Sequence, residues 1–235
     1  DFHCENGTDC IIICGTTGES ATMTEEEHLE CVKFAIDRAK GRIPVIAGTG
    51  SNCTRTAVEL SKEAADYGAD GLLVITPYYN KASKAGMVNH FMQVADAVNT
   101  PVYIYNVPGR TGVSLTYEAL AEISQHKNIV GLKESSGNMS LICNFSKMIN
   151  ENFNVYSGND DINVALMSMG GAGSISVMAN ILPKEVHDIA MACQNGDFET
   201  ARMMQLTFRD VRWGLSLEPL PIRIEGAWGR GGVAV

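Results

Sequence analysis

The sequence predicts an α/β fold of the (β/α)8 TIM-barrel type, in which short parallel strands alternate with helices. Three observations predict it: short apolar runs recur along the chain, amphipathic helical patterns lie between them, and the repeat is roughly 25–30 residues long. A chain of 235 residues with 45% hydrophobic residues can bury a substantial core. We therefore expect one large domain.

Seven apolar runs have the length and composition of buried strands. They are Cys10–Cys14, Pro44–Ala47, Gly71–Thr76, Pro101–Tyr105, Ile129–Lys133, Val155–Ser157 and Ser174–Met178. Runs that are apolar throughout are typical of parallel sheets covered by helices. A doubly wound open sheet is the alternative, but the first strand–helix turn lacks its dinucleotide fingerprint G-x-G-x-x-G.

Helices are predicted from capping residues and from apolar residues spaced three and four apart. Thr24 and Glu27 form a capping box at the start of the first helix, and Gly68 is a suitable end for the second. The predicted helices are Thr24–Ala39, Ala57–Tyr67, Val88–Val98 and a shorter one after Thr116.

Both ends depart from the barrel plan. Seven strands do not close such a barrel with the usual shear, so we expect the first strand and most of its helix to lie upstream of Asp1. At the other end, one long helix is predicted over Asp197–Leu217, then a turn at Glu218–Pro221. The residues that follow are too rich in glycine for a stable helix. We therefore divide the chain into a barrel domain, 1–217, and an atypical or incomplete segment, 218–235.

Composition argues against several functions. A net charge of -9 without a block of like charges argues against nucleic acid or an anionic membrane as partner. No apolar run approaches the ~20 residues that span a bilayer. The five histidines show no metal-binding spacing. The seven cysteines form no C-x-x-C pair, and we interpret them as reduced core residues of a cytoplasmic protein.

The strand Ile129–Lys133 ends abruptly on a lysine. At the carboxyl end of a buried strand, this lysine can reach an active-site mouth. Partial desolvation there lowers the pKa of the amine, and a neutral amine is a nucleophile for carbonyl carbons. The alternative is that Lys133 merely marks the place where a strand meets water.

Two other strand ends carry hydroxyl groups. The loop with Thr16 and Thr17 can present N–H groups to a carboxylate, or it is an ordinary Gly/Thr turn. Tyr78 and Tyr79 are either phenols for proton transfer or residues of packing or an interface.

The fourth strand ends at Tyr105, and a Pro-Gly turn then directs Arg110 over the mouth or onto the surface. Arginine there suits a bidentate grip on a substrate carboxylate. The glycines of 170–173 could cradle a phosphate, although close backbone packing is the favoured interpretation. Lysine, tyrosine, threonine and arginine at four strand ends together describe an imine-forming site.

Four motifs carry a resemblance to a known family. They are G-T-T-G-E-S at 15–20, T-P-Y-Y-N at 76–80, Y-N-V-P-G-R-T-G at 105–112 and G-L-K-E-S at 131–135. Over about residues 5–222 the chain closely resembles the dihydrodipicolinate synthases (4-hydroxy-tetrahydrodipicolinate synthases), pyruvate-dependent class I aldolases. The resemblance implies a lyase of lysine (diaminopimelate) biosynthesis that condenses pyruvate with L-aspartate 4-semialdehyde through a lysine Schiff base.

The resemblance also implies the roles of individual residues. Lys133 forms the Schiff base with pyruvate. The proton relay comprises Tyr105, Thr16 and Tyr79, of which Tyr79 reaches into the site of a neighbouring subunit. The substrate-binding residues are Thr17 for the pyruvate carboxylate, Arg110 for the semialdehyde carboxylate, and Gly158 and Ile175 along the pocket. Because the imine is itself the electron sink, neither a metal nor an organic cofactor is needed.

Two other functions remain open. Sibling aldolases such as N-acetylneuraminate lyase and 2-keto-3-deoxy sugar-acid aldolases share the lysine, the tyrosine and the Gly-rich loop, but Arg110 favours the synthase. A catalytically silent assembly or binding protein is the second alternative. The resemblance implies a homotetramer, a dimer of dimers, with small molecules rather than nucleic acid or membrane as partners.

The family's feedback site for lysine lies at its dimer interface. The residues that match it are Ser20, Ala21, His28, Asn52 and Tyr78. Thr56 stands where the family has an acidic residue, which removes a partner for the ammonium group of the effector. We predict weakened or absent inhibition by lysine, and strong inhibition at sub-millimolar lysine in a steady-state assay would refute it.

Overall fold

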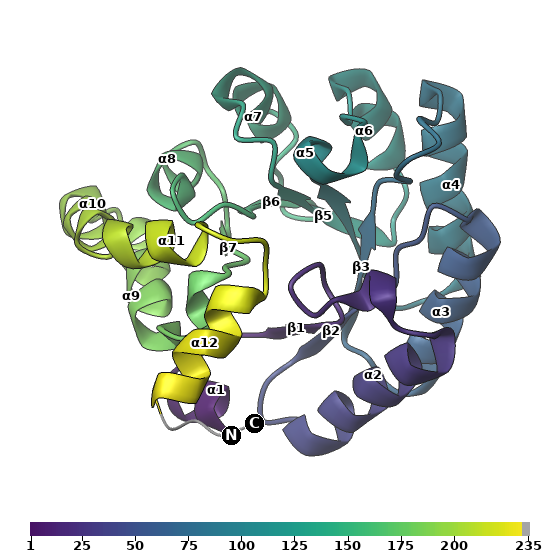
Figure 1. The fold of residues 1–235 in the computed structure, drawn as a ribbon. Helices are drawn as coiled ribbons and strands as arrows, with labels where there is room; N and C mark the ends of the chain where they lie inside the picture. Colours follow the sequence, from purple (N-terminus) through teal and green to yellow (C-terminus); the bar gives the residue numbers. More distant parts are fainter. Residues whose placement is uncertain (232–235) are drawn as a thin grey trace.

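A computed structural model describes residues 1–231 as a curled parallel sheet surrounded by helices (Figure 1). Seven strands lie in sequence order, and each is hydrogen-bonded to the next. They are β1 (Ile11–Ile13), β2 (Val45–Gly48), β3 (Gly71–Ile75), β4 (Val102–Asn106), β5 (Ile129–Glu134), β6 (Asn154–Ser157) and β7 (Gly173–Ser174). The α/β class, the parallel direction and the seven predicted strands are confirmed; β1 and β7 are the edge strands among the described residues.

The helices cover the outer side of the sheet (Figure 1). They are α1 (Phe2–Glu5), α2 (Glu25–Ala39), α3 (Thr54–Asp66), α4 (Lys84–Ala97), α5 (Pro108–Thr111), α6 (Tyr117–Ile123), α7 (Met139–Ser146), α8 (Asn163–Ser168), α9 (Pro183–Gln194), α10 (Phe198–Thr207), α11 (Arg209–Leu215) and α12 (Ile222–Gly231). Two short 3-10 helices are η1 (Ser20–Thr22) and η2 (Met178–Asn180).

Helix starts follow the predicted capping chemistry. The Thr24 side chain accepts from the Glu27 N–H, and the Glu27 side chain accepts from the Thr24 N–H, which confirms the capping box of α2. Thr116 caps α6 in the same manner, by accepting from the Ala119 N–H.

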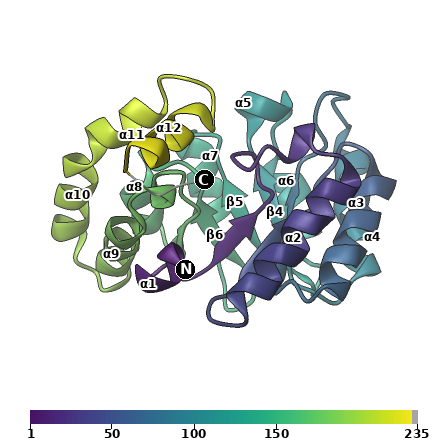
Figure 2. The ribbon, with the colours of Figure 1, turned by 60° about the horizontal axis from the view of Figure 1, so that its bottom comes forward.

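One core lies between the sheet and its helices. Leu72, Val102 and Leu132 on the strands are fully buried, as are Phe91 on α4 and Ile142 on α7. Parallel strands that are covered in this way bring their carboxyl ends to one end of the molecule. Figure 2 shows β1 running toward the end at which α5, α11 and α12 lie.

The interpretation of the cysteines as core residues holds only in part. All seven are free thiols, but only Cys14 and Cys193 are buried, and Cys53 and Cys143 are exposed. Within residues 1–231, no helix is long and apolar enough to cross a membrane.

The seventh strand is shorter than predicted. The sequence predicts Ser174–Met178, whereas β7 has two residues and η2 begins at Met178. The reason is a competing acceptor, because the N–H groups of Val177 and Met178 donate to the carboxylate of Asp160 rather than to a neighbouring strand.

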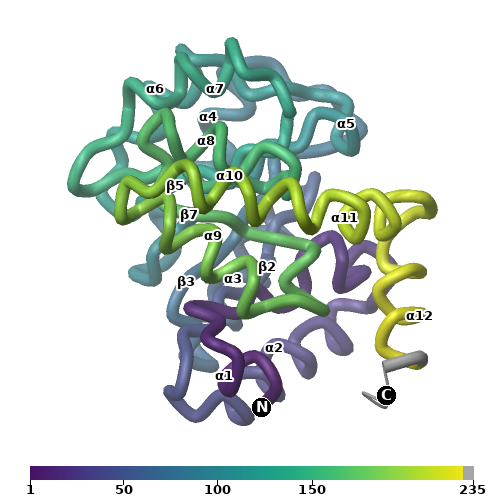
Figure 3. Tube along the Cα trace, turned by 90° about the vertical axis from the view of Figure 1, so that its left-hand side faces the viewer, coloured from purple at the N-terminus to yellow at the C-terminus, as the bar shows by residue number. Residues whose placement is uncertain are grey.

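The prediction of one long helix over Asp197–Leu217 is wrong. The chain forms α10 and α11, and the break falls at Phe208, whose φ of -91° and ψ of 6° leave the helical region. The break allows Leu215 to pack in a second apolar cluster with Met178 and Ile189. Figure 3 shows α12 turning away from the end of α11.

The expectation that glycine prevents a helix after the turn at Glu218–Pro221 is also wrong. The turn is present, but α12 continues to Gly231. Ile224 is buried in the second apolar cluster, and the Trp228 Nε1–H donates to the Asn180 carbonyl at 2.9 Å. This packing outweighs the penalty of about 1 kcal/mol for each glycine. The division into 1–217 and 218–235 stays a prediction, and residues 232–235 lie outside the described residues.

Candidate active site

A cleft of about 180 Å³ lies at the carboxyl ends of the strands. Strand ends contribute most of its lining, and α11 and the turn after it contribute the rest. The lining residues are Thr16, Thr17, Tyr105, Val107, Arg110, Lys133, Ser135, Gly158, Asn159, Asp160, Val177, Arg212, Leu215, Ser216 and Leu220.

Lys133 lies on β5 directly beside Tyr105 on β4, because the two residues are paired in the sheet register. The Lys133 Nζ is 4.2 Å from the centroid of the Tyr105 ring. Burial lowers the pKa of Lys133 below its ordinary value of 10.5, and nearby Arg110 lowers it further. Tyr105 and Asp160 oppose this shift. The cleft therefore holds an amine that gives up its proton more readily than a lysine in water.

The residue after Lys133 anchors the strand from the other side. Glu134 is fully buried, and it accepts from the Asn106 Nδ2–H at 2.8 Å and from the Ser136 N–H at 2.6 Å. Burial raises the pKa of Glu134, while these hydrogen bonds lower it. Because alternate side chains of a strand point to opposite faces, the network fixes β5 without entering the face that carries Lys133.

Gly158 forms a wall of bare backbone against Lys133. A Cβ atom at Gly158 would lie 1.9 Å from the Ser135 Oγ and 3.0 Å from the Lys133 Cε. Only glycine fits this approach. The Ser135 Oγ is buried and has no hydrogen-bond partner among the described residues, so it is a free polar group beside the lysine.

The structure brings most of the predicted site residues together. Of the eight, six line the cleft: Lys133, Tyr105, Thr16, Thr17, Arg110 and Gly158. Ile175 is not a lining residue, and its N–H donates to the Ser157 carbonyl at 2.7 Å.

Tyr79 lies outside the cleft of its own chain. Its side chain is 88% exposed, its φ is +72°, and its N–H donates to the Thr111 carbonyl at 3.2 Å. A left-handed backbone is uncommon for a bulky residue, and here the backbone hydrogen bond to the loop of Arg110 holds it. The phenol therefore points into space that this chain does not fill.

The residues of the predicted lysine site lie elsewhere. None of the five lines the cleft. Ser20 and Ala21 are in η1, and His28 is buried on α2 with its Nε2 2.7 Å from the Gly48 carbonyl oxygen. Burial lowers the pKa of His28. Asn52 and Tyr78 are partly exposed.

Sequence reasoning missed five polar lining residues: Ser135, Asn159, Asp160, Arg212 and Ser216. Asn159 and Asp160 directly follow β6, so the rule applied to the other strand ends could have found them. Ser135 stands two residues after Lys133. Arg212 is on α11, where nothing in the local sequence marks it as part of a cleft.

A larger groove of about 560 Å³ lies between η2 and α10–α11. It shares Asp160 and Arg212 with the cleft, but its other lining residues include no lysine, cysteine or histidine. The amine that the sequence predicts as a nucleophile, Lys133, therefore lies in the smaller cleft.

The sequence gives no support to a metal site and favours backbone packing over a phosphate site at 170–173. Among the described residues, no three His, Cys, Asp or Glu side chains are grouped to hold a metal ion. A Cβ at Gly171 would lie 2.2 Å from the Leu166 Cδ2, so this glycine serves close packing, as the sequence interpretation favoured.

Comparison with known proteins agrees with this geometry. The chain matches the Dihydrodipicolinate synthetase family over residues 1–235. It is 49% identical over 228 residues to the 4-hydroxy-tetrahydrodipicolinate synthase of Thermoanaerobacter sp. (strain X514), an alignment that covers 97% of this chain and 77% of the relative. It is 48% identical over 235 residues to the same enzyme of Clostridium novyi (strain NT), with coverage of 100% and 79%.

Solved structures show the same fold. Dihydrodipicolinate synthase from Aquifex aeolicus superposes with a TM-score of 0.95 and 44% identity over 97% of this chain and 78% of that one. The chloride-inhibited enzyme from Acinetobacter baumannii, solved in complex with pyruvate, has a TM-score of 0.96 and 39% identity over 100% and 80%. These likenesses extend across the cleft and all seven strands, and the chain therefore belongs to the dihydrodipicolinate synthetase family.

Proposed function

We propose that this chain is a lyase that condenses pyruvate with L-aspartate 4-semialdehyde to give 4-hydroxy-tetrahydrodipicolinate. The observation that carries the proposal is the Lys133 amine, which lies at the end of β5 in a cleft, with its pKa lowered by burial and the Tyr105 ring 4.2 Å away. The names of the relatives at 48–49% identity support the same reaction.

The first steps follow from the amine and the phenol. The neutral Lys133 amine attacks the ketone carbon of pyruvate, and loss of water leaves a protonated imine. The pyruvate methyl group then loses a proton through Tyr105, and the iminium takes up the electron pair to become an enamine. Thr16 and the Tyr79 of a neighbouring subunit carry that proton onward.

The later steps consume the enamine. Its carbon attacks the aldehyde carbon of the semialdehyde, the aldehyde oxygen takes up the proton held by the relay to become a hydroxyl, and the iminium on Lys133 is restored. The amine of the second substrate then attacks this iminium carbon and displaces the Lys133 nitrogen as the ring closes. The Lys133 side chain is released as the free amine, so the enzyme returns to its starting form.

Two groups bind the substrate carboxylates in this proposal. Thr17 lies in the loop after β1 and holds the carboxylate of pyruvate. Arg110 lies in the short helix α5, lines the cleft and grips the carboxylate of the semialdehyde. Gly158 leaves room for the reacting carbon beside Lys133, and Ile175 supports that wall from behind.

Borohydride reduction in the presence of pyruvate tests the chemistry. Intact-mass and peptide mass analysis should show a reduced pyruvyl adduct on Lys133 in the wild type and none in Lys133→Ala. A matched control is Lys147→Ala, which removes an exposed lysine and should leave the adduct in place. A folded wild type without an adduct on Lys133 would overturn the proposal.

The second substrate is tested separately. The wild-type enzyme is given pyruvate together with either L-aspartate 4-semialdehyde or N-acetylmannosamine, and the consumption of pyruvate is measured. We expect pyruvate to be consumed with the semialdehyde and not with N-acetylmannosamine. Turnover with the sugar aldehyde alone would assign the chain to the sibling lyases.

We also propose that the curled sheet belongs to a closed (β/α)8 barrel and that the enzyme assembles as a homotetramer. The sequential order of parallel strands and the position of the cleft at their carboxyl ends support the barrel. The exposed Tyr79 phenol supports assembly, because proton transfer requires that it reach another chain's cleft. Light scattering after size-exclusion chromatography gives the mass of the assembly.

A further inference from the structure

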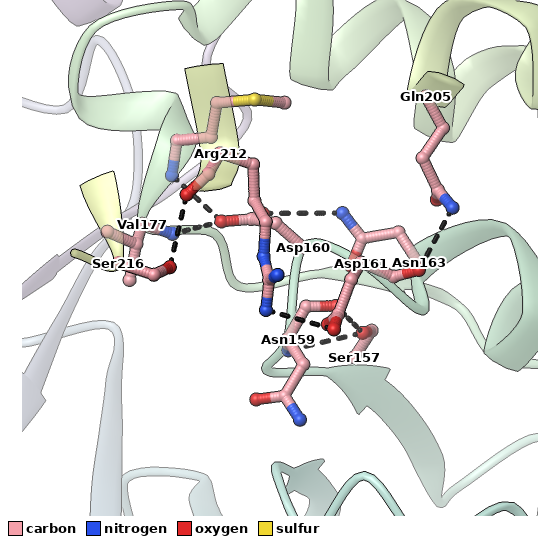
Figure 4. A network of polar contacts seen from close by, with 10 residues as sticks. Ser157, Asn159, Asp160, Asp161, Asn163, Val177, Gln205, Arg212 and Ser216 are labelled. Carbon is pink, nitrogen blue, oxygen red and sulfur yellow. Dashed lines mark hydrogen bonds and ion pairs between the residues drawn. The ribbon is translucent and has the colours of Figure 1, made fainter. Parts of the chain in front are cut away.

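The loop after β6 carries an aspartate whose carboxylate is fixed in place (Figure 4). The Asp160 Oδ2 accepts from the Val177 N–H at 3.1 Å and from the Met178 N–H at 2.9 Å. Its Oδ1 accepts from the Asn163 Nδ2–H at 3.4 Å. Three donors from two segments therefore hold this carboxylate against the wall of the cleft.

The neighbouring aspartate has a different environment. Asp161 is exposed and pairs with Arg212 at 2.9 Å, and its backbone carbonyl accepts from the Gln205 Nε2–H at 3.0 Å (Figure 4). Asp160 forms no ion pair within the described residues. Asp161 is thus paired with an arginine, whereas the carboxylate of Asp160 accepts hydrogen bonds only from N–H donors and lines the cleft.

We propose that Asp160 is a positioning residue of the active site, whose fixed carboxylate faces Lys133 and stabilises positive charge on its nitrogen. This inference rests on the proposed function, and it assigns to Asp160 the balance of charge at the Schiff base. Without Asp160, the protonated imine would share the cleft with the cationic side chains of Arg110 and Arg212 and with no carboxylate.

Cationic side chains outnumber carboxylates in the lining of the cleft around Lys133. Arg110 from α5 and Arg212 from α11 both line the cleft, and Tyr105 presents its ring and phenol from β4. On the groove side, Arg209 and Asp210 complete the surroundings of Asp160. Burial and Arg110 lower the pKa of Lys133, while Tyr105 and Asp160 raise it. Asp160 is the one carboxylate among the cleft-lining residues.

The chemical consequence concerns the step after condensation. Attack by the amine with loss of water and gain of one proton gives an iminium, and the positive nitrogen is what draws electrons from the methyl C–H bond. A carboxylate held in place beside the nitrogen stabilises that positive charge. Because three hydrogen bonds already hold Asp160, the charge requires no rearrangement when the iminium forms.

The test compares Asp160→Asn with Asp161→Asn. Two rates are measured as a function of pH. The first is the rate at which acetic anhydride labels Lys133, read by peptide mass, and the second is the rate at which the reduced pyruvyl adduct forms. We expect the midpoint of Lys133 labelling to move to lower pH by about one unit in Asp160→Asn, because a charge that favours the protonated amine is gone. In Asp161→Asn the midpoint should stay at the wild-type value.

A second variant covers the possibility that Asp160→Asn fails to fold. The double change Asp160→Asn with Asn163→Asp keeps the contacts, since the amide oxygen at 160 accepts from the backbone and its NH2 donates to the new carboxylate. It moves the negative charge from the cleft lining to residue 163, which does not line the cleft, so we expect a shift of the midpoint in the same direction but smaller.

Coincident labelling midpoints in the wild type and either Asp160 variant would overturn the inference, as would an equal shift in Asp161→Asn. Labelling does not require pyruvate, so this outcome is distinguishable from failure of the proposed function, which is the absence of any pyruvyl adduct in the wild type. Melting curves identify the variants that are folded.

Discussion

At the scale of single residues, the site is a balance between burial and charge around Lys133. Burial and Arg110 favour the neutral amine, whereas Tyr105 and Asp160 favour the charged one. A lysine that must be neutral to attack and positive once it forms an imine needs both influences. The bare backbone of Gly158 gives the side chain the space in which to react.

The approach of Gly158 predicts the effect of adding one methyl group. In Gly158→Ala the new Cβ would overlap the Ser135 Oγ and crowd the Lys133 Cε, so the amine is displaced. We expect the rate of pyruvate adduct formation to fall about 100-fold, as for misplacement of a reacting group by 1 Å. Gly109→Ala is the control, since nothing lies within 4 Å of a Cβ there. Equal rates in the two variants would contradict the argument.

The lowered pKa of Lys133 predicts how stability depends on pH. In the unfolded chain lysine keeps its proton up to about its ordinary pKa of 10.5, while the folded chain releases it at lower pH. Between these two values the unfolded state binds more protons, so stability rises with pH toward 10.5 and is reduced below it.

Lys133→Met removes this penalty. We expect urea unfolding to show that the variant is more stable than the wild type at pH 7, and that the difference shrinks as pH rises toward 10. Lys147→Met, at an exposed lysine, serves as the control. A difference that stays constant with pH would count against the shifted pKa.

At the scale of elements, local capping signals in the sequence were sufficient to predict where helices of the repeated strand–helix units begin. The capping box at Thr24 and the cap at Thr116 are both present. Local signals failed where tertiary contacts decide the structure. No residue near Phe208 predicts a break between α10 and α11. The glycines of α12 predict that no helix forms, but the packing of Ile224 and Trp228 stabilises one.

The packing of α12 predicts a strong effect at one isoleucine and a weak one at another. Ile224→Ala should lower the free energy of unfolding by about 2–5 kcal/mol, because a fully buried side chain is truncated. Ile222→Ala lies in the same helix but is 52% exposed, and it should change stability little. Urea denaturation measures both. If 218–235 were a separate segment, neither change would affect the main transition.

At the scale of the whole molecule, the proposed site requires groups from more than one chain. Lys133, Tyr105, Thr16 and Thr17 line one cleft, as the strand-end rule predicts. Tyr79 is at a strand end too, yet it points outward. The rule gives the end of the sheet to which a residue belongs, but not whether its side chain turns inward or toward a neighbour.

Mixing two inactive variants tests the shared site. Tyr79→Phe keeps Lys133, and Lys133→Ala keeps Tyr79, so a mixed oligomer has clefts in which both groups are intact. We expect the mixture, after dissociation and reassembly, to regain synthase activity that neither variant has alone. Tyr105→Phe mixed with Lys133→Ala is the control, because both residues belong to one cleft and no intact site forms. Recovery in both mixtures, or in neither, would refute the sharing.

The two walls of the cleft differ in how far they can be changed by substitution. At Gly158 a new side chain would force the side chains of Ser135 and Lys133 to shift, so substitution there disturbs the nucleophile. The other wall consists of Arg212, Leu215, Ser216 and Leu220, which lie in α11 and the turn after it, beyond β7. A library meant to change which aldehyde is accepted should therefore be confined to this second wall, where new side chains alter the shape of the entrance and leave the nucleophile untouched.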